Sequence, residues 1–274
     1  MKGIFLLFAV ASIYGDMQPE IPRTIQENSL LFRSWIKYSQ FGEEGILDEI
    51  LSRLHLITGY FVEFGAWDGC ILSNTRFLAE RGWGGVYIES DTDRLNEAKK
   101  NCQHFSNVLC LNEFVAWDRA TSLGKTFDQI ADEFFPDQEI DVLSIDVDGP
   151  DYLILEGLKR RPKIIIVEGG ICWHPLVTHR VPDRIGTSYL SQPLAVICKI
   201  AKKKGYLPVC YTINAFFVRS DLFDKFTEIK NDPVSLWFDS WYYYLKNNPA
   251  IAHYVREQRG MNPWISQFDP YELP

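Results

Sequence analysis

Short apolar runs alternate with stretches of helical periodicity between residues 39 and 219, and this alternation limits the possible folds more than any other feature of the chain. The runs at 61–64 (FVEF) and 164–167 (IIIV) are nearly continuous, as strands buried on both faces are. Between the runs lie segments of about 10–15 residues with the spacing of amphipathic helices. Strands and helices that alternate in this way form a parallel sheet covered on both faces.

The predicted strands are 60–66, 85–90, 107–115, 141–149, 163–170 and a final pair within 206–219. The predicted helices are 39–54, 74–81, 93–102, 125–135, 151–160 and one within 189–205. We therefore predict an α/β fold with a doubly wound, mostly parallel sheet. From residue 221 the chain is rich in aromatic residues and the alternation stops, which predicts a helical extension packed on the core. A lid or a partner surface is the alternative.

Charge and cysteine spacing limit the partners. The net charge is -8 at pH 7, whereas phosphate binding relies on clustered Lys and Arg, so we predict no nucleic-acid partner. The basic run at 199–204 (KIAKKK) is explained by a helix C-terminus, where the dipole favours positive charge.

The cysteines include no C-x-x-C pair, so they indicate no metal or redox motif and leave the compartment undecided. They are Cys70, Cys102, Cys110, Cys172, Cys198 and Cys210.

The first residues of the chain, 1–15 (MKGIFLLFAVASIYG), have a single Lys, an apolar stretch and small residues near the end, as a secretory signal peptide does. The stretch is too short to span a bilayer, which takes about 20 residues. We predict a signal segment and export; the alternative is an element packed on the domain of a cytoplasmic protein. The rest of the predicted organisation is a lead-in at 16–37, a main domain at 38–222 and an extension at 223–274.

The first predicted strand ends in a glycine turn with an acid before it, FVEFGAWDG (61–69). Gly65 and Gly69 would let the backbone approach a ligand closely, and ligands of open parallel sheets bind at the carboxyl ends of the strands. Glu89 ends the second strand, about 20 residues after Gly69, where an acid binds the ribose of a nucleotide. These features together predict a nucleotide-type ligand.

The turn differs from the dinucleotide motif G-x-G-x-x-G because its two glycines are four positions apart. Glu63 would also repel a phosphate. A carboxylate here suits a ligand with a cationic or hydrogen-donating group. S-adenosylmethionine, with its sulfonium and ammonium groups, meets this requirement, which disfavours the third hypothesis of an NAD-linked oxidoreductase.

At these residues the chain resembles the FkbM-type branch of class I S-adenosylmethionine-dependent methyltransferases. The resembling segments are YSQFGEEGIL (38–47), FVEFGAWDGCILSNTRFLAERGWGGVYIES (61–90), DVLSIDVDGPDYLIL (141–155), RPKIIIVEGG (161–170) and KKGYLPVCYTINAFFVRSDL (203–222). The resemblance implies a Rossmann-like methyltransferase fold with a seven-stranded sheet. It also implies an enzyme that methylates a hydroxyl of a sugar or another small acceptor.

The same resemblance implies which residues contact the cofactor. The methionine part would lie against Glu63, Gly65, Ala66 and Gly69. The ribose would be held by Glu89, with Ser90 and Asp91 beside the adenosine. The adenine would be flanked by Glu113 and Phe114, the alternative for Phe114 being core packing.

Three carboxylates follow the fourth predicted strand, in DVDGPD (146–151). Alternation along an extended strand would set Asp146 and Asp148 on one side, where they would raise a pKa or bind a cation. Asp146 is the predicted base or orienting group for an acceptor hydroxyl, whereas Asp148 and Asp151 are predicted to cap the next helix. A divalent metal is not expected; the candidate ligands for one are Asp146, Glu168 and His174.

The acceptor and the oligomeric state stay open. Resembling sequences commonly read E-Y-N where this chain reads EGG (168–170), on the acceptor side of the expected site. No nucleophilic triad or G-x-S-x-G motif is needed, because the sulfonium is already activated and alignment supplies much of the acceleration. The alternative function is a non-catalytic binding or trafficking protein that keeps the fold in an exported compartment.

Overall fold

The computed structural model describes residues 24–117, 124–170, 173, 175–181, 184–185, 188–189 and 191–247. The signal-like segment at 1–15 and residues 248–274 of the predicted extension lie outside them. The main feature is a seven-stranded sheet in the order β10-β11-β7-β6-β1-β2-β3. Its strands are β1 (Tyr60–Phe64), β2 (Gly84–Glu89), β3 (Val108–Asn112), β6 (Val142–Ile145), β7 (Ile164–Glu168), β10 (Tyr206–Tyr211) and β11 (Asn214–Arg219).

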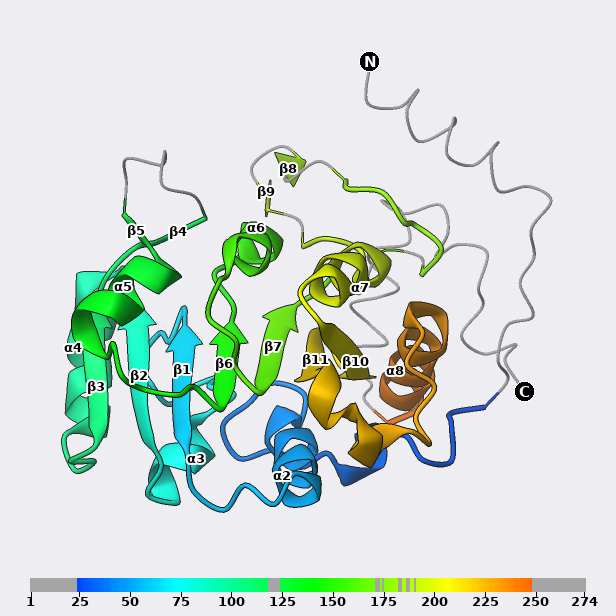
Figure 1. Cartoon of the computed structure of the whole chain (residues 1–274), viewed down its shortest axis with the longest axis horizontal. Helices are drawn as coiled ribbons and strands as arrows, with labels where there is room; N and C mark the ends of the chain where they lie inside the picture. Colours follow the sequence, from blue (N-terminus) through cyan, green and yellow to red (C-terminus); the bar gives the residue numbers. More distant parts are fainter. Residues whose placement is uncertain are drawn as a thin grey trace.

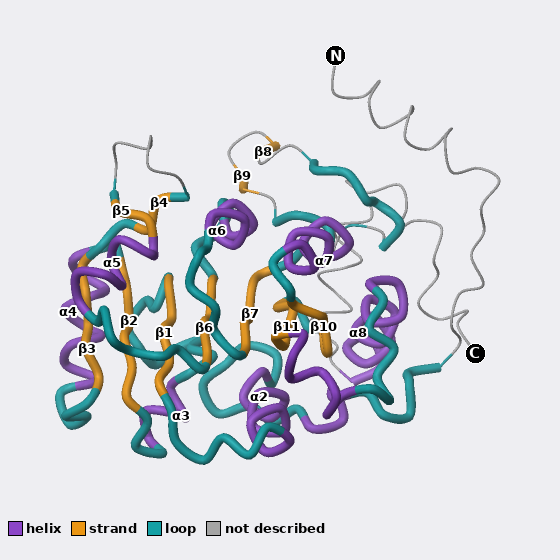
Figure 2. Tube along the Cα trace, viewed as in Figure 1, coloured by secondary structure: helices purple, strands orange, loops and turns teal. Residues whose placement is uncertain are grey.

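Helices cover both faces of this sheet. They are α2 (Glu43–Arg53), α3 (Arg76–Glu80), α4 (Thr92–Cys102), α5 (Phe127–Phe134), α6 (Asp151–Gly157), α7 (Leu194–Lys203) and α8 (Pro233–Asn247), with the 3-10 turns η1 (Leu30–Arg33) and η2 (Ser220–Phe226). Figures 1 and 2 show α5, α6 and α7 on one side of the sheet and α2 and α3 on the other. None of the helices in the described part of the chain combines the length and hydrophobicity that a membrane span requires.

The strand directions and the core confirm the predicted fold class. Within the sheet every pairing is parallel except those of β11, which runs antiparallel to both of its neighbours. The central strands are buried completely, as Phe61, Val62 and Ile166 illustrate. Burial on both faces is the reason that these strands are apolar at successive positions. A mostly parallel seven-stranded sheet between helices is the Rossmann-like methyltransferase fold.

The third predicted strand, 107–115, is too long. β3 ends at Asn112, and the chain then forms a separate two-stranded sheet from β4 (Val115–Ala116) and β5 (Lys125–Thr126). The backbone N–H of Lys125 donates to the carbonyl of Phe114 (3.2 Å), which holds this turn away from β3. A second small sheet pairs β8 (Arg184–Ile185) with β9 (Ser188–Tyr189).

The aromatic helix α8 packs against the edge strand β10, α7 and η1. Its apolar face is buried, with Trp237, Trp241 and Tyr244 each at most 4% exposed. Asp239, also buried, accepts hydrogen bonds from the backbone and side chain of Gln26 (2.9 and 2.8 Å). α8 therefore covers the sheet edge and ties the start of the described chain to the core.

Candidate functional site

The strand order reverses at β1, because β2 and β3 follow on one side of it and β6 and β7 lie on the other. Ligands of open α/β sheets bind at such a point, outside the carboxyl ends of the strands. Three non-glycine residues in the loops that follow β1 and β6 have positive φ: Trp67 (50°), Leu72 (61°) and Asp148 (54°). Backbone strain of this kind clusters at ligand-binding and catalytic sites. The geometry therefore marks this edge of the sheet as the candidate site.

The two glycines of the β1 turn meet different neighbours. Gly65 is exposed, with φ at +63°, and a Cβ on it would lie 1.7 Å from the carbonyl oxygen of Asp146. Gly69 has φ at +68°, and a Cβ on it would lie 3.2 Å from the Sγ of Cys102 in α4. Ala66 between them is buried and donates its N–H to the carbonyl of Ile88 (3.3 Å). Gly65 thus lies at the open edge, whereas Gly69 packs under α4.

Glu63 is buried and holds the returning loop against β1. Its carboxylate accepts hydrogen bonds from the hydroxyls of Ser73 and Thr75 (2.6 Å each) and from the backbone N–H of Asn74 (2.8 Å). The side-chain amide of Asn74 donates to Ser144 in β6 (3.1 Å), which links the same loop to the next strand. Burial raises the pKa of Glu63. Direct contact between Glu63 and a cofactor stays a prediction.

Glu89 ends β2 with its carboxylate between two loops. One oxygen accepts the backbone N–H of Trp67 (2.9 Å) and the other accepts that of Asp91 (2.8 Å). The oxygen that accepts the Trp67 N–H keeps a further acceptor site for a ligand hydroxyl, whereas the other also lies within reach of the Ser90 hydroxyl. Asp91 caps α4 by accepting the N–H groups of Asp93 (2.8 Å) and Arg94 (3.0 Å). The guanidinium of Arg94 in α4 lies over the Trp67 ring (3.9 Å), so the turn after β1 is braced against the first turn of α4.

The remaining predicted cofactor residues lie along the same edge. Ser90 is exposed, with its hydroxyl 3.4 Å from an oxygen of Glu89. Glu113 accepts a hydrogen bond from Lys125 (2.8 Å) just beyond the end of β3. The side chain of Phe114 is 38% exposed, so the core-packing alternative for it is wrong.

Three carboxylates converge where β6 and β7 end. Oxygens of Asp146, Asp148 and Glu168 all lie within 4.8 Å of one another. Asp146 and Glu168 are partly buried, and Asp148 is exposed. Burial and the charge of Glu168 raise the pKa of Asp146, and burial with the charge of Asp151 raises the pKa of Glu168 to about 7. Such a group can hold a shared proton near neutral pH or bind a divalent cation that prefers oxygen ligands.

The predicted capping role of Asp148 and Asp151 is wrong. The residue before α6 is Pro150, and no side-chain hydrogen bond caps this helix. β6 has already ended at Ile145, and Asp148 has left-handed backbone angles. A tight turn, and not alternation along an extended strand, therefore places Asp148 beside Asp146.

Asp151 and Ser191 hold this cluster in place through hydrogen bonds. Asp151 is buried and accepts the backbone N–H groups of Val147 (2.7 Å) and Gly149 (2.9 Å), which closes the turn; burial raises its pKa to about 6. The hydroxyl of Ser191 donates to Glu168 (2.8 Å). His174, the third predicted metal candidate, lies outside the described residues.

Sequence reasoning missed several supporting residues: Ser73, Asn74 and Thr75 around Glu63, and Ser191 on Glu168. The run SNT (73–75) before α3 is a local signal for a helix start, but it does not identify Glu63 as the partner. Nothing in the sequence around Ser191 indicates its bond to Glu168, because the two are far apart along the chain.

No protein-family profile matches the chain, and no curated protein matches it. Solved structures do match. One is an S-adenosylmethionine-dependent methyltransferase from Thiobacillus denitrificans in complex with S-adenosyl-L-homocysteine: 17% identity, TM-score 0.33, covering 80% of this chain and 83% of that one. A TehB-like methyltransferase from Corynebacterium glutamicum has 10% identity, TM-score 0.35, and coverages of 59% and 80%. A methyltransferase from Aquifex aeolicus has 15% identity, TM-score 0.34, and coverages of 62% and 86%.

Proposed function

We propose that this protein is an S-adenosylmethionine-dependent methyltransferase of the FkbM type that methylates a hydroxyl of a sugar or another small acceptor. One observation carries the proposal. The carboxylate of Glu89 is fixed between the turn after β1 and the start of α4, next to the exposed Gly65, at the point where the strand order reverses. This is where an open α/β sheet binds a nucleotide ribose.

The acidic side chains at this edge of the sheet support a cationic cofactor. Glu63, Asp146 and Glu168 lie at this edge, and the pKa of Asp146 is raised by burial first and then by the charges of the neighbouring acids, Glu63 among them. A concentration of acids favours a sulfonium over the phosphates of a dinucleotide. Glu89 would accept hydrogen bonds from ribose hydroxyls. Gly65 has no side chain, so the methionine part of the cofactor could approach the backbone closely. When bound, S-adenosylmethionine supplies an activated methyl group.

Asp146 is the group proposed to receive the acceptor's proton. Burial and Glu168 raise its pKa, so the carboxyl can take up and release a proton closer to neutral pH than an ordinary aspartate. Glu168 and Asp148 would stabilise the proton or orient the acceptor. The proposed mechanism does not use a metal ion. If one binds, Asp146, Asp148 and Glu168 are the residues that could hold it.

The cofactor part of the proposal is tested at Glu89. In Glu89→Gln the amide nitrogen must face one of the two backbone N–H groups that the carboxylate accepts, so the side chain cannot keep both bonds. We expect isothermal titration to show that S-adenosyl-L-homocysteine binds about tenfold more weakly or worse, a loss of about 1.4 kcal/mol or more. The matched control is Glu228→Gln, which removes one exposed charge beside Arg53, and should bind like the wild type. Absence of binding by the wild type would refute the proposal.

The catalytic part is tested at Asp146. We expect Asp146→Asn to keep cofactor affinity but to form S-adenosylhomocysteine about 10²–10⁴-fold more slowly in the presence of a cell extract that contains the acceptor. Unchanged turnover would remove Asp146 from the mechanism. Turnover that is lost with EDTA and restored by Mg²⁺ would instead assign the three carboxylates to a metal. A wild type that binds the cofactor but never consumes it would favour the non-catalytic alternative.

A further inference from the structure

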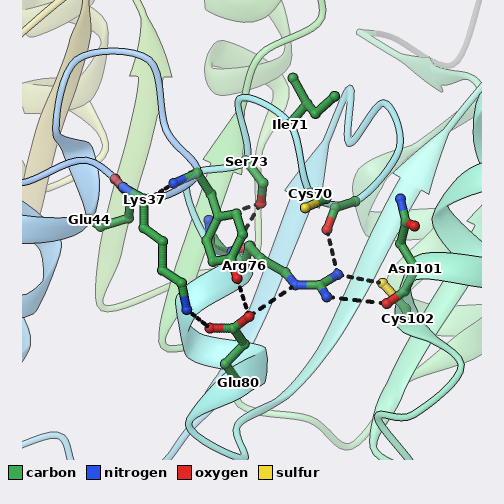
Figure 3. A network of polar contacts seen from close by, with 12 residues as sticks. Lys37, Glu44, Cys70, Ile71, Ser73, Arg76, Glu80, Asn101 and Cys102 are labelled. Atoms are coloured by element: carbon green, nitrogen blue, oxygen red, sulfur yellow. Dashed lines mark hydrogen bonds and ion pairs between the residues drawn. The ribbon is translucent and has the colours of Figure 1, made fainter.

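Three cysteines from three elements approach one buried arginine beside the candidate site. Cys70 lies in the turn after β1, Cys102 is the last residue of α4, and Cys110 is in β3. Arg76 is 6% exposed, and its guanidinium donates to the Sγ of Cys102 (3.6 Å; Figure 3). Its positive charge favours the thiolate form of all three cysteines. No other part of the proposed function uses these thiols.

The register of the sheet brings Cys110 to the face that α4 covers. Cys110 is paired with Tyr87 in β2, and Tyr87 is paired with Glu63 in β1, so the three side chains form a row on one face. α4 packs against β2 and β3, and its terminal residue, Cys102, is buried. α4 therefore holds the Cys102 thiol over the face of β3 that carries Cys110, close enough for each thiol to shift the pKa of the other. They are therefore neighbours although they lie in different elements.

The two thiols differ in access and acidity. Cys110 is partly exposed on the edge strand, whereas Cys102 is 4% exposed. The neighbouring Cys102 thiol lowers the pKa of Cys110, and the charges of Lys99 and Arg76 act in the same direction. Cys110 in turn raises the pKa of Cys102. Because the thiolate is the reactive form, Cys110 is suited to attack first and Cys102 to resolve the product.

Cys102 also helps to fix the glycine turn. Arg76 donates to the carbonyls of Gly69 (3.0 Å) and Asn101 (3.2 Å) as well as to Cys102, as Figure 3 shows for its labelled neighbours. The side chain of Asn101 in turn donates to the carbonyl of Asp68 (2.9 Å). Cys102 itself packs closely under Gly69, since a Cβ there would lie 3.2 Å from its Sγ. A movement of Cys102 would therefore disturb the turn.

We propose that Cys102 and Cys110 form a reversible disulfide that loosens the attachment of the glycine turn to α4. The oxidant is a hydroperoxide. The Cys110 thiolate attacks a peroxide oxygen, the O–O bond breaks, and water or an alcohol leaves with a proton from solvent. The sulfenic acid on Cys110 is then attacked by Cys102, which forms the S–S bond and releases water. A dithiol reductant reverses the reaction by thiol–disulfide exchange. An S–S bond of about 2.05 Å draws the Cys102 sulfur away from Arg76 and Gly69.

The experiment compares the folded, full-length protein before and after treatment with hydrogen peroxide. We expect intact mass spectrometry to show the loss of two hydrogen atoms, reversed by dithiothreitol, and peptide mapping to show a Cys102–Cys110 link. Hydrogen exchange in the peptide 65–75 should become at least about threefold faster in the oxidised protein. Cys110→Ser should abolish the link, and the matched control Cys198→Ser, a buried thiol in α7, should retain it. In Cys102→Ser, dimedone should label Cys110.

A link between Cys70 and Cys102, no link at all in the wild type, or unchanged exchange in 65–75 would each overturn the proposal. The wild-type mapping decides the matter if a serine variant does not fold, which thermal unfolding would show. None of these readouts needs a cofactor. Weaker binding of S-adenosyl-L-homocysteine by the oxidised protein is a further expectation that rests on the proposed function. If neither form binds it, the proposed function fails while the disulfide result stands.

Discussion

At the scale of single residues, the glycines of the β1 turn show that one sequence pattern can have two causes. Gly65 is needed because the end of β6 touches it, whereas Gly69 is needed because α4 lies beneath it. Both also have positive φ, which side chains disfavour. Only Gly65 lies exposed at the candidate site, so the two positions are expected to respond differently to substitution.

Gly65→Ala and Gly82→Ala separate the steric contact from the backbone strain. Gly82, the residue after α3, has φ at +85° and nothing within 4 Å of an added Cβ, so only strain of about 1–2 kcal/mol is expected there. At Gly65 the clash with Asp146 adds about 1–3 kcal/mol. Urea unfolding should therefore show the larger loss for Gly65→Ala. Equal losses would mean that the backbone at Asp146 moves aside at little cost. Close approach would then not be the reason for a glycine at position 65.

At the scale of elements, local signals placed most ends correctly. Gly82 follows α3 with a positive φ, as a glycine after a helix end does, and Thr126 and Gln129 form the capping box that starts α5. The prediction for β3 was wrong because residues 115–116 have the same apolar character as a strand but pair with 125–126 in another sheet. Periodicity identifies a strand but does not identify its partner.

The aromatic segment illustrates the same limit. Its composition predicted a helix on the core or a lid, and α8 is buried against the edge strand β10 through residue 244. The hydroxyl of Tyr244 donates to the carbonyl of Phe41 (2.8 Å), and Ser240 donates to Thr212 (2.7 Å). The first bond joins residues 203 positions apart along the chain and the second joins residues 28 apart, so composition could not reveal either contact.

At the scale of the whole molecule, the candidate site concentrates acids in a chain that is already negative. Burial raises the pKa of Glu63, Asp146, Asp151 and Glu168. An acid whose pKa is higher in the folded state binds more protons there than in the unfolded state. The free energy of unfolding therefore falls as the pH rises from the unfolded to the folded pKa. A bound cation would offset this cost, which is consistent with a site that trades stability for function.

Glu168→Gln tests this cost. For Glu168 the window runs from its ordinary pKa of 4.5 to about 7, where ionisation of the buried group lowers stability by up to about 3 kcal/mol. Glutamine cannot ionise and can still accept the hydrogen bond from Ser191. We expect urea unfolding to show a smaller loss of stability across this window than in the wild type. Glu139→Gln, whose side chain is 69% exposed, should behave like the wild type. If the free energy of unfolding falls with pH as steeply in Glu168→Gln as in the wild type, ionisation of another group causes the loss of stability.

The sequence by itself determined the α/β class, the glycine turn, and the strand ends at which Glu89, Asp146 and Glu168 lie. These features depend on periodicity and on turn chemistry, which are local properties of the chain. Only the tertiary structure decided that Ser73 and Thr75 donate to Glu63, that Ser191 donates to Glu168, and that α4 places Cys102 against β3. Such contacts depend on strand register and on the direction of each side chain, which packing between distant segments sets.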